Sequence, residues 1–262
     1  YDDQALIVSN PGIRSLTPAA KFLKASTQSS DLKMNRSSWR PLTTLSYALV
    51  YRLNGLDPRA YHALSVVLHI AAALAAYALV LLLFGSAWPA FIAAAVFLLH
   101  PVQAESVAWA GASANPLCAL FYLLSLCCLV SWNRRPRAPV LLGAFVCAGL
   151  ALLSKEMAAS LPLTAGLCLW LDRRRGGPFR WRVLLGLAVL VGLFAAARSA
   201  ALGQTAQTGY WAGSFAAQMF TMAHAFARYL RLTLVPAGLS VDHLIPVARS
   251  LDAGTLACFA LL

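Results

Sequence analysis

Charged residues are scarce in this chain, and acidic residues are the scarcest. Only 11% of the 262 residues are charged, 60% are hydrophobic, and nine Asp and Glu stand against 21 Lys and Arg. A single water-soluble domain of this size cannot bury so much apolar surface. The stretch 61–84 has no charged residue, and about 20 apolar residues are enough for a helix to cross a bilayer. The sequence therefore predicts a protein that is largely embedded in lipid.

Several functional motifs are also missing. The chain has no glycine-rich nucleotide loop, no metalloprotease His–Glu pair and no nucleophile elbow. The net charge of +12 is spread between apolar runs and does not form one basic stripe, so a nucleic-acid partner is not expected. The cysteines lack zinc-site spacing and lie inside apolar runs, where they are interpreted as packing residues: Cys118, Cys127, Cys128, Cys147, Cys168 and Cys258.

Apolar segments follow one another after residue 60. They lie near 61–84, 87–104, 112–132, 138–153, 157–171, 183–198 and 214–235, with a further run from 253. This pattern predicts an all-α, polytopic transmembrane helix bundle over residues 61–262. Tyr1 is not an initiator, and the last run stops at Leu262, so we expect further sequence at both ends.

The first sixty residues are more polar and are predicted to form a separate loop outside the bilayer. Thr17 followed by Pro18 is typical of a helix start, which predicts a short helix through Ala25. A second helix is predicted over 41–54, with Gly55 as its stop. Their composition favours amphipathic helices lying in the membrane interface.

Arginine-rich connectors predict the orientation of the bundle. Three arginines follow the third apolar run at 134–137, and five follow the fifth run at 173–182. The positive-inside rule makes both connectors cytoplasmic. Counting outward then places 1–60 and the turns near 100–111, 155–156 and 203–213 together on the opposite face. The first loop carries eight Lys or Arg against four Asp, which indicates an anionic partner there, with lipid head groups as the simplest choice.

Two acidic residues at the start of the chain are candidates for chemistry. Asp2 and Asp3 would lie at the outer mouth of a preceding helix. A carboxylate in that position can take a proton from a hydroxyl or hold a divalent metal, and its neighbour tunes its pKa. Acidic pairs also cap ordinary loops, so the pair alone does not decide between these roles.

Two turns bring further ionisable residues to the same predicted face. His100 and Glu105 share one turn, and Lys155 and Glu156 share another. Ionisable groups at membrane depth are costly and are often functional. The alternatives are a structural histidine in the first turn and a self-neutralising ion pair in the second.

Histidines and arginines on predicted helices complete the candidate set. His62 and His69 are seven residues apart and share a helical face, where a buried hydrogen bond to a neighbouring helix is the simpler explanation. Arg228 and Arg231 also share a face and could grip a phosphate. Their segment, 214–235, either dips into the membrane from the outer face or crosses it, in which case both arginines anchor it at the cytoplasmic end.

The combination of motifs resembles the TMTC family and its bacterial relatives. These motifs occur in the family's order: Tyr1-Asp2-Asp3, Asn35 to Thr43 (NRSSWRPLT), Gly55-Leu56, Tyr61-His62, Leu68-His69, His100 to Val107 (HPVQAESV), Leu153 to Glu156 (LSKE), Arg228 to Arg231, Pro236 and Leu239 to His243 (LSVDH). Gln103 replaces a histidine of the family's turn, and Asn115 stands where many members have an acidic residue.

The resemblance implies a membrane glycosyltransferase of the GT-C type, whose members commonly carry tetratricopeptide repeats after the membrane part. It implies a polyprenyl- or dolichyl-phosphate sugar donor, with mannose as the sugar and a protein Ser/Thr hydroxyl or a glycan as the acceptor. The catalytic acid of the first outer loop maps onto Asp2 and Asp3. The membrane would be the bacterial inner membrane, or the endoplasmic reticulum in a eukaryote, with the site on the non-cytoplasmic face.

The expected mechanism is a single displacement in which one of these aspartates deprotonates the acceptor hydroxyl. The leaving phosphate needs cations, and the candidates are Arg40, Lys155, Arg228 and Arg231. The residues expected to support the cavity are His62, His69, His100, Glu105 and Glu156. A divalent metal is compatible with this scheme but not required. A secondary transporter and a non-catalytic membrane anchor for a repeat domain remain as alternatives.

Overall fold

The described part of the protein is mostly helical. The computed structural model describes residues 3–17, 22–23, 39–202, 212–240, 245–250 and 253–259, and no strand occurs within these ranges. The chain divides into two compact units, residues 1–205 and residues 206–262. The all-α prediction is confirmed, and each unit is described by itself.

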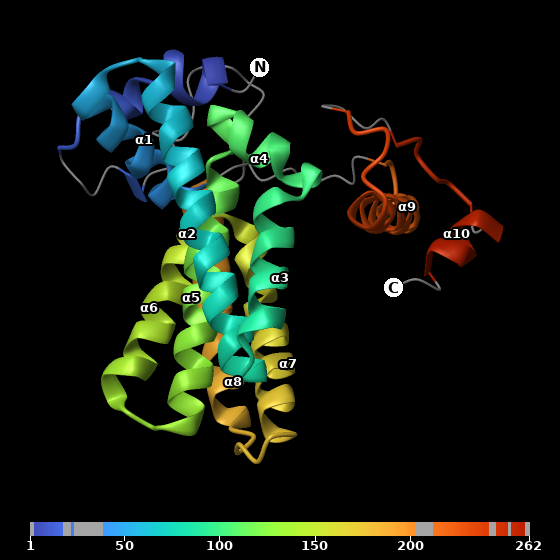
Figure 1. Cartoon of the computed structure of the whole chain (residues 1–262). Helices are drawn as coiled ribbons and strands as arrows, with labels where there is room; N and C mark the ends of the chain where they lie inside the picture. The colour runs from blue at the N-terminus through green and yellow to red at the C-terminus, as the bar shows by residue number, and fades with distance from the viewer. Residues whose placement is uncertain are drawn as a thin grey trace. The chain divides into compact units, whose positions relative to one another are not determined.

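Six long helices form the bundle of the first unit and run side by side (Figure 1). They are α2 (Pro58–Phe84), α3 (Ala87–Leu99), α5 (Ala114–Arg134), α6 (Ala138–Ser154), α7 (Leu161–Arg173) and α8 (Trp181–Leu202). Helix α5 packs against α2, α6 and α7. Buried leucines from four helices meet in the core, among them Leu79, Leu129, Leu169 and Leu187.

The lengths and compositions of several of these helices suit a bilayer. Three helical stretches, 58–84, 110–134 and 181–202, are long and apolar enough to cross a membrane. Helix α3 and the short helices after it, 101–108, pass the same test together and are bent by 47°, as a broken span or a re-entrant loop would be. Large apolar side chains on the outside of the bundle remain exposed, as lipid-facing residues do; they include Leu74, Leu142, Leu163 and Leu193. The prediction of a transmembrane helix bundle is confirmed.

A second, smaller core lies at one end of the bundle, where the N-terminal segments pack. It contains η1 (Gln4–Val8), η2 (Pro11–Arg14) and α1 (Pro41–Asn54), and its buried side chains include Ile13, Tyr47 and Tyr61. Helix α1 has the predicted bounds, because Pro41 suits a first helical position and Gly55 adopts a φ of 61° at its end. Most of the expected helix from Thr17 to Ala25, residues 18–21 and 24–25, lies outside the described residues.

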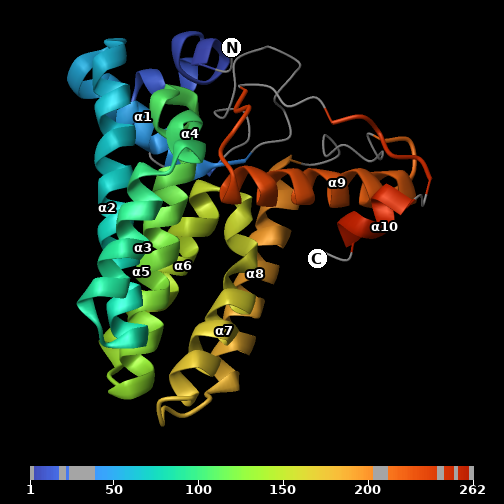
Figure 2. The ribbon, with the colours of Figure 1, turned by 45° about the vertical axis from the view of Figure 1, so that its right-hand side comes forward.

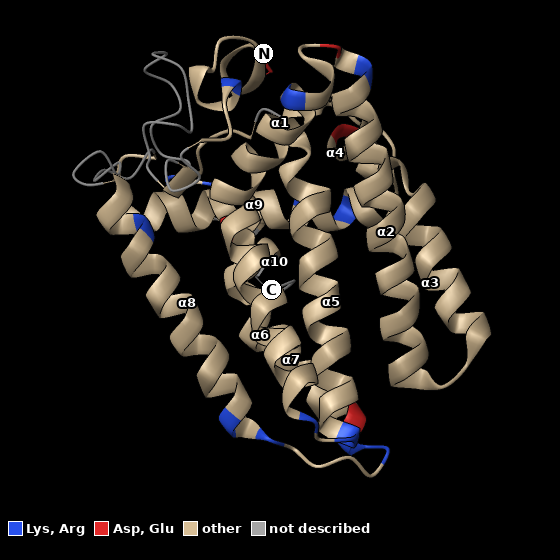
Figure 3. Cartoon of the chain, turned by 90° about the vertical axis from the view of Figure 1, so that its left-hand side faces the viewer, with Lys and Arg blue, Asp and Glu red and all other residues tan. Residues whose placement is uncertain are grey.

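The opposite end of the bundle carries the arginine-rich connectors (Figure 3). There the buried carboxylate of Asp172, 1% exposed, ties α7 to α5. Its two oxygens accept hydrogen bonds from Asn133 Nδ2 and Arg134 Nε, each at 2.8 Å. One acid thus fixes the ends of two helices at the arginine-rich end.

The second unit contains α9 (Phe215–Leu234) and α10 (Ala253–Phe259), which pack against each other (Figure 2). Ser214 caps α9, and its hydroxyl accepts a hydrogen bond from the Ala217 N–H at 3.1 Å. His224 of α9 and Thr255 of α10 join the two helices through a hydrogen bond of 3.0 Å.

Candidate active site

An ion pair between α1 and the α6–α7 turn is the centre of the candidate site. Arg40 directly precedes α1, and Glu156 begins the short helix η7 (Glu156–Ser160). Arg40 Nη2 lies 2.8 Å from Glu156 Oε1, and Arg40 Nε donates to Oε2 at 3.2 Å. Such a two-point contact fixes orientation as well as charge. The sequence left a self-neutralising pair with the neighbouring Lys155 as an alternative, whereas in the structure Glu156 pairs with Arg40.

The positive surroundings keep Glu156 ionised. Partial burial by itself would raise the pKa of this carboxyl, but the hydrogen bond from Arg40, the residue's own backbone N–H and the charges of Arg40 and Arg198 lower it to about 2. A carboxylate of such low basicity is a poor proton acceptor at neutral pH. Glu156 therefore suits a role in holding cations in place.

Lys155 points to a different partner. Its Nζ hydrogen-bonds to Asn115 Oδ1, and Asn115 Nδ2 in turn donates to Ser106 Oγ at 3.0 Å. Burial and repulsion by Arg40 lower the pKa of Lys155, while Glu156 and, more weakly, Glu105 oppose that shift. The amide of Asn115 thus orients the ammonium without neutralising it.

Local contacts explain why the two cations lie at this place. Pro41 begins α1, so Arg40 stands at its N-terminus, and Thr43 Oγ1 donates to the Ser154 carbonyl at 2.9 Å. That bond ties the first turn of α1 to the last residue of α6. On the other side of Arg40, the Trp39 ring packs on Phe194 of α8 with 5.6 Å between centroids. Residues 39–43 are therefore anchored to both α6 and α8.

Asp3 lies at the same end of the bundle, where it is half-buried. Its Oδ1 accepts a hydrogen bond of 2.5 Å from the Gly111 backbone N–H. A β-carbon at Gly111 would lie 2.7 Å from that oxygen, so only glycine fits there without displacing the carboxylate. Asp2 lies outside the described residues.

A buried tyrosine holds the backbone that Asp3 contacts. Tyr47 OH donates to the carbonyls of Ala110 and Gly111 at 3.2 and 3.1 Å, and it accepts from Ser113 Oγ at 3.0 Å. Burial, and to a lesser extent the charge of Asp3, raise the pKa of Tyr47 to about 12. The phenol therefore stays protonated and acts as a fixed donor to the loop before α5.

The three predicted histidines lie in different environments. His69 is buried, its Nε2 lies 3.1 Å from the Leu98 carbonyl, and its ring stacks on Phe97. His100 Nδ1 accepts from the Val102 N–H at 3.2 Å and caps the turn after α3. His62 is exposed on α2. His69 and His100 thus hold α2, α3 and the following turn together.

The structure brings some of the predicted residues together and leaves others apart. Arg40, Lys155 and Glu156 form one cluster, and Glu105 acts on Lys155 from the exposed surface of α4 (Ala104–Ala108). Arg228 and Arg231 are exposed on α9 of the second unit, and their role in donor binding stays a prediction. Among the residues that the structure describes, no three His, Cys, Asp or Glu side chains are grouped to hold a metal ion.

Sequence reasoning did not include Arg198, Asn115 and Tyr47 in the candidate site. Arg198 is the only charged residue between Arg182 and Arg228. A lone charge at the end of an apolar run is a recognisable signal of a polar site. Asn115 and Tyr47 gave no such signal, because polar side chains of these types are common near helix ends.

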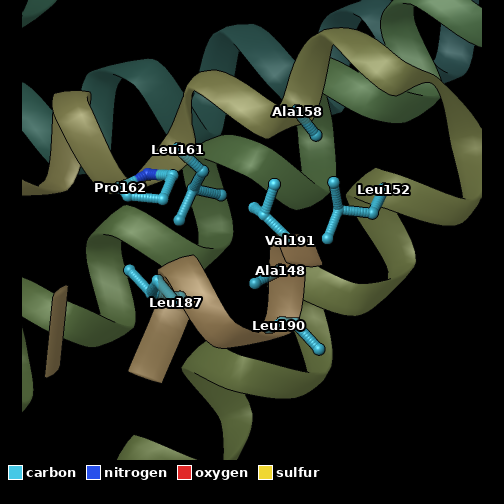
Figure 4. A pocket seen from close by; sticks show the side chains of 8 residues that line it. All are labelled: Ala148, Leu152, Ala158, Leu161, Pro162, Leu187, Leu190 and Val191. Atoms are coloured by element: carbon cyan, nitrogen blue, oxygen red, sulfur yellow. The ribbon is translucent and has the colours of Figure 1, made fainter. Parts of the chain in front are cut away.

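An apolar crevice lies next to the charged turn (Figure 4). Its lining comes from α6, η7, α7 and α8, and it leaves no room for a water molecule in this conformation. Two of its lining residues, Leu152 and Ala158, flank the Lys155–Glu156 turn in sequence. The remaining lining residues are also apolar: Ala148, Leu161, Pro162, Leu187, Leu190 and Val191.

Comparison with known proteins identifies the family. The human "Protein O-mannosyl-transferase TMTC2" is 32% identical over 168 residues, 62% of this chain and 20% of the relative. The Drosophila melanogaster "Protein O-mannosyl-transferase Tmtc1" is 32% identical over 174 residues, 64% of this chain and 20% of the relative. The Xenopus laevis "Protein O-mannosyl-transferase tmtc2" is 37% identical over 130 residues, 49% of this chain and 16% of the relative.

The chain thus spans about a fifth of the length of the curated relatives it matches. No solved structure matches it. The family profile described as dolichyl-phosphate-mannose-protein mannosyltransferase matches residues 40–199, from Arg40 through nearly all of α8. This match covers more than half of the chain, which therefore belongs to the dolichyl-phosphate-mannose-protein mannosyltransferase family.

Proposed function

We propose that this chain is the membrane part of a GT-C type glycosyltransferase. It would take mannose from a polyprenyl- or dolichyl-phosphate carrier and transfer it to a protein Ser/Thr hydroxyl. The family match over residues 40–199 supports this proposal, as do relatives whose names give protein O-mannosyl-transfer as their activity. A bacterial inner membrane is the proposed location, or the endoplasmic reticulum membrane in a eukaryote, with the site on the non-cytoplasmic face.

The observation that carries the proposal is the pairing of cations with an apolar crevice. Arg40 contacts Glu156, Lys155 precedes it in sequence, and the crevice residues Leu152 and Ala158 flank the same turn in sequence. A lipid-phosphate sugar has the matching chemistry, because its phosphate is anionic and its polyprenyl chain is apolar. In a site of low dielectric constant, preorganised cations stabilise the charge that develops on a leaving phosphate. Arg228 and Arg231 are proposed as further contacts to that phosphate.

The proposed reaction is a single displacement at the anomeric carbon. Asp3 or Asp2 takes the proton of the acceptor hydroxyl while its oxygen forms the new bond to carbon. The bond from that carbon to the phosphate oxygen breaks, so the configuration inverts and the polyprenyl phosphate leaves with the electron pair. The Gly111 N–H bonded to Asp3 Oδ1 fixes the carboxylate in one orientation, which supports this residue as the base.

Labelled donor tests the proposal directly. Full-length protein in proteoliposomes would be given polyprenyl-phosphate [³H]mannose and an acceptor peptide rich in Ser and Thr. We expect label in the peptide, and a loss of at least about tenfold in the Lys155→Ala variant, since one charge–phosphate contact is worth that much. Arg135→Ala, at the arginine-rich end, is the matched control. Label that crosses the membrane on an intact carrier would favour a transporter, and no use of the donor would favour an anchor.

A further inference from the structure

Helix α9 carries an exposed apolar stripe along its whole length. The residues of this α9 stripe are 37–58% exposed, and they are Phe215, Met219, Met222, Phe226 and Tyr229. They follow one another in alternating steps of four and three residues. At 100° per residue they fall within an arc of about 80°. Three aromatic rings and two methionines thus form one continuous face.

The other side of α9 carries its polar and charged side chains, together with buried apolar residues such as Ala217 and Leu232. Thr221 Oγ1 accepts a hydrogen bond from the Ala248 N–H at 3.0 Å, and His224 contacts both Thr255 and Cys258. Arg228 and Arg231 each follow a stripe residue by two positions, which places them about 200° around the helix from it. The helix contains no Asp or Glu. The charged side chains of α9 are therefore all cationic.

This distribution does not suit a helix that crosses the bilayer. Although α9 has 20 residues, it is not among the described helices that are apolar enough to span. A crossing would place Arg228, Arg231 and His224 at the depth of the hydrocarbon, where charged and polar side chains are costly. A helix with aromatic and aliphatic residues on one face and arginines on the other is instead typical of the membrane interface.

We propose that α9 lies along the membrane surface, with its stripe embedded in lipid. The stripe would sit at the boundary between head groups and acyl chains, and the two arginines would face the anionic phosphates and water. Helices α2, α5 and α8 are long and apolar enough to hold the chain in a bilayer. Membrane lipid is therefore the partner that we assign to this face. The inference depends on membrane location and not on sugar transfer.

Spin labels on the two faces of α9 test the inference. A genetically encoded ketone amino acid, coupled to a nitroxide, would replace one residue at a time, which leaves the six native cysteines in place. The full-length protein would be placed in nanodiscs of phosphatidylethanolamine and phosphatidylglycerol. Collision with oxygen and with a nickel chelate then gives the depth of each label. The stripe positions are 219, 222, 226 and 229, and the matched positions on the polar side are 228 and 231.

We expect all four stripe labels at one shallow depth, about 5–10 Å below the phosphates, with the nickel chelate excluded. The labels at 228 and 231 should collide freely with the chelate. A depth that increases from 219 towards the bilayer centre, about 15 Å down, would mean a crossing helix and would overturn the inference. Shielding of the stripe from both reagents would also overturn it, because protein and not lipid would then cover this face. Transfer activity, measured separately on the unlabelled protein, bears only on the proposed function.

Discussion

Arg40 holds the carboxylate of Glu156 at two points, 2.8 and 3.2 Å away, across 116 residues of sequence. The contact joins the start of α1 to the turn between α6 and α7. It brings the guanidinium next to Lys155, whose pKa burial and Arg40 lower. The negative charge of Glu156 therefore allows the cations Arg40 and Lys155 to lie close together.

Glu156→Gln should weaken the contact that holds Arg40 next to Lys155, without unfolding the bundle. The amide can accept one hydrogen bond from Arg40 but cannot offset the charges of Arg40, Lys155 and Arg198. Because the Glu156 side chain is 41% exposed, solvent screens the pair, and we expect a loss of only about 0.5–1 kcal/mol in unfolding free energy. Transfer should fall further, by roughly tenfold, since a displaced cation no longer meets the donor phosphate. Thermal unfolding in detergent and the labelled-donor assay measure the two effects, with Asp57→Asn at the exposed start of α2 as the control.

The same residue predicts a dependence of stability on pH. The pKa of Glu156 is lowered from 4.5 to about 2 in the folded protein, so the folded state binds the proton less tightly than the unfolded state. Its stabilising contribution is complete above about pH 4.5 and is lost as pH falls from there towards 2. The difference in melting temperature between wild type and Glu156→Gln should therefore shrink over that interval. A difference that stays constant from pH 6 to pH 3 would contradict the assignment.

Gly111→Ala should impair transfer through Asp3. The new methyl group would lie 2.7 Å from Asp3 Oδ1, which forces the carboxylate off the Gly111 N–H. We expect a loss of at least about tenfold in turnover, with helix content and melting temperature little changed. Gly149→Ala in α6 is the matched control, because nothing lies within 4 Å of its added carbon. Equal activity in both variants would show that transfer does not depend on the position of the Asp3 carboxylate.

Asp3→Asn should abolish transfer and preserve the fold. The amide oxygen can still accept the hydrogen bond from the Gly111 N–H, and the change in volume is small, so packing is retained. What is lost is a group able to take the acceptor's proton. Turnover with labelled donor is the measurement, and Asp2→Asn is tested beside it. Normal turnover in both variants would rule out the carboxylate mechanism.

Asp172→Ala should destabilise the protein without touching the chemistry. The change leaves the side-chain donors of Asn133 and Arg134 without their acceptor, the Asp172 carboxylate. The side chain of Asp172 is only 1% exposed, so water does not readily replace it. Buried donors left without an acceptor cost about 1–3 kcal/mol, which thermal unfolding would detect. The remaining folded protein should keep the wild-type turnover per molecule. The control is Arg173→Gln, at the exposed residue next to Asp172. It should leave the melting temperature unchanged within experimental error.

Local signals in the sequence predicted the helices well. Pro41 and Gly55 delimit α1 as expected, because a proline favours the first position and a glycine with positive φ ends the helix. The predicted run 87–104 is shorter in the structure, where α3 ends at Leu99. The reason is Pro101, which holds His100 in an extended conformation and starts a new turn.

The candidate site was only partly predictable. Charge alone drew attention to Lys155 and Glu156, but the partner of each depends on packing between distant segments. Asn115 reaches Lys155 across 40 residues, and Arg40 reaches Glu156 across an even longer stretch. No periodicity or spacing in the sequence encodes such pairings, since they follow from how α1, α5 and α6 pack. Arg198 was missed for the same reason, although its isolation in an apolar run was visible.

The shortness of α6 and α7 has a consequence for the bilayer itself. At 1.5 Å per residue, their 17 and 13 residues measure about 26 and 20 Å, against about 30 Å of hydrocarbon. Helix α2, with 27 residues, measures about 40 Å. Since α6 begins and α7 ends at the arginine-rich connectors, in a bilayer about 30 Å thick the turn between them would stop several ångströms short of the far surface. Such hydrophobic mismatch thins the surrounding lipid. The ammonium of Lys155 would then meet a phosphate where the bilayer is locally thinner than elsewhere around the bundle.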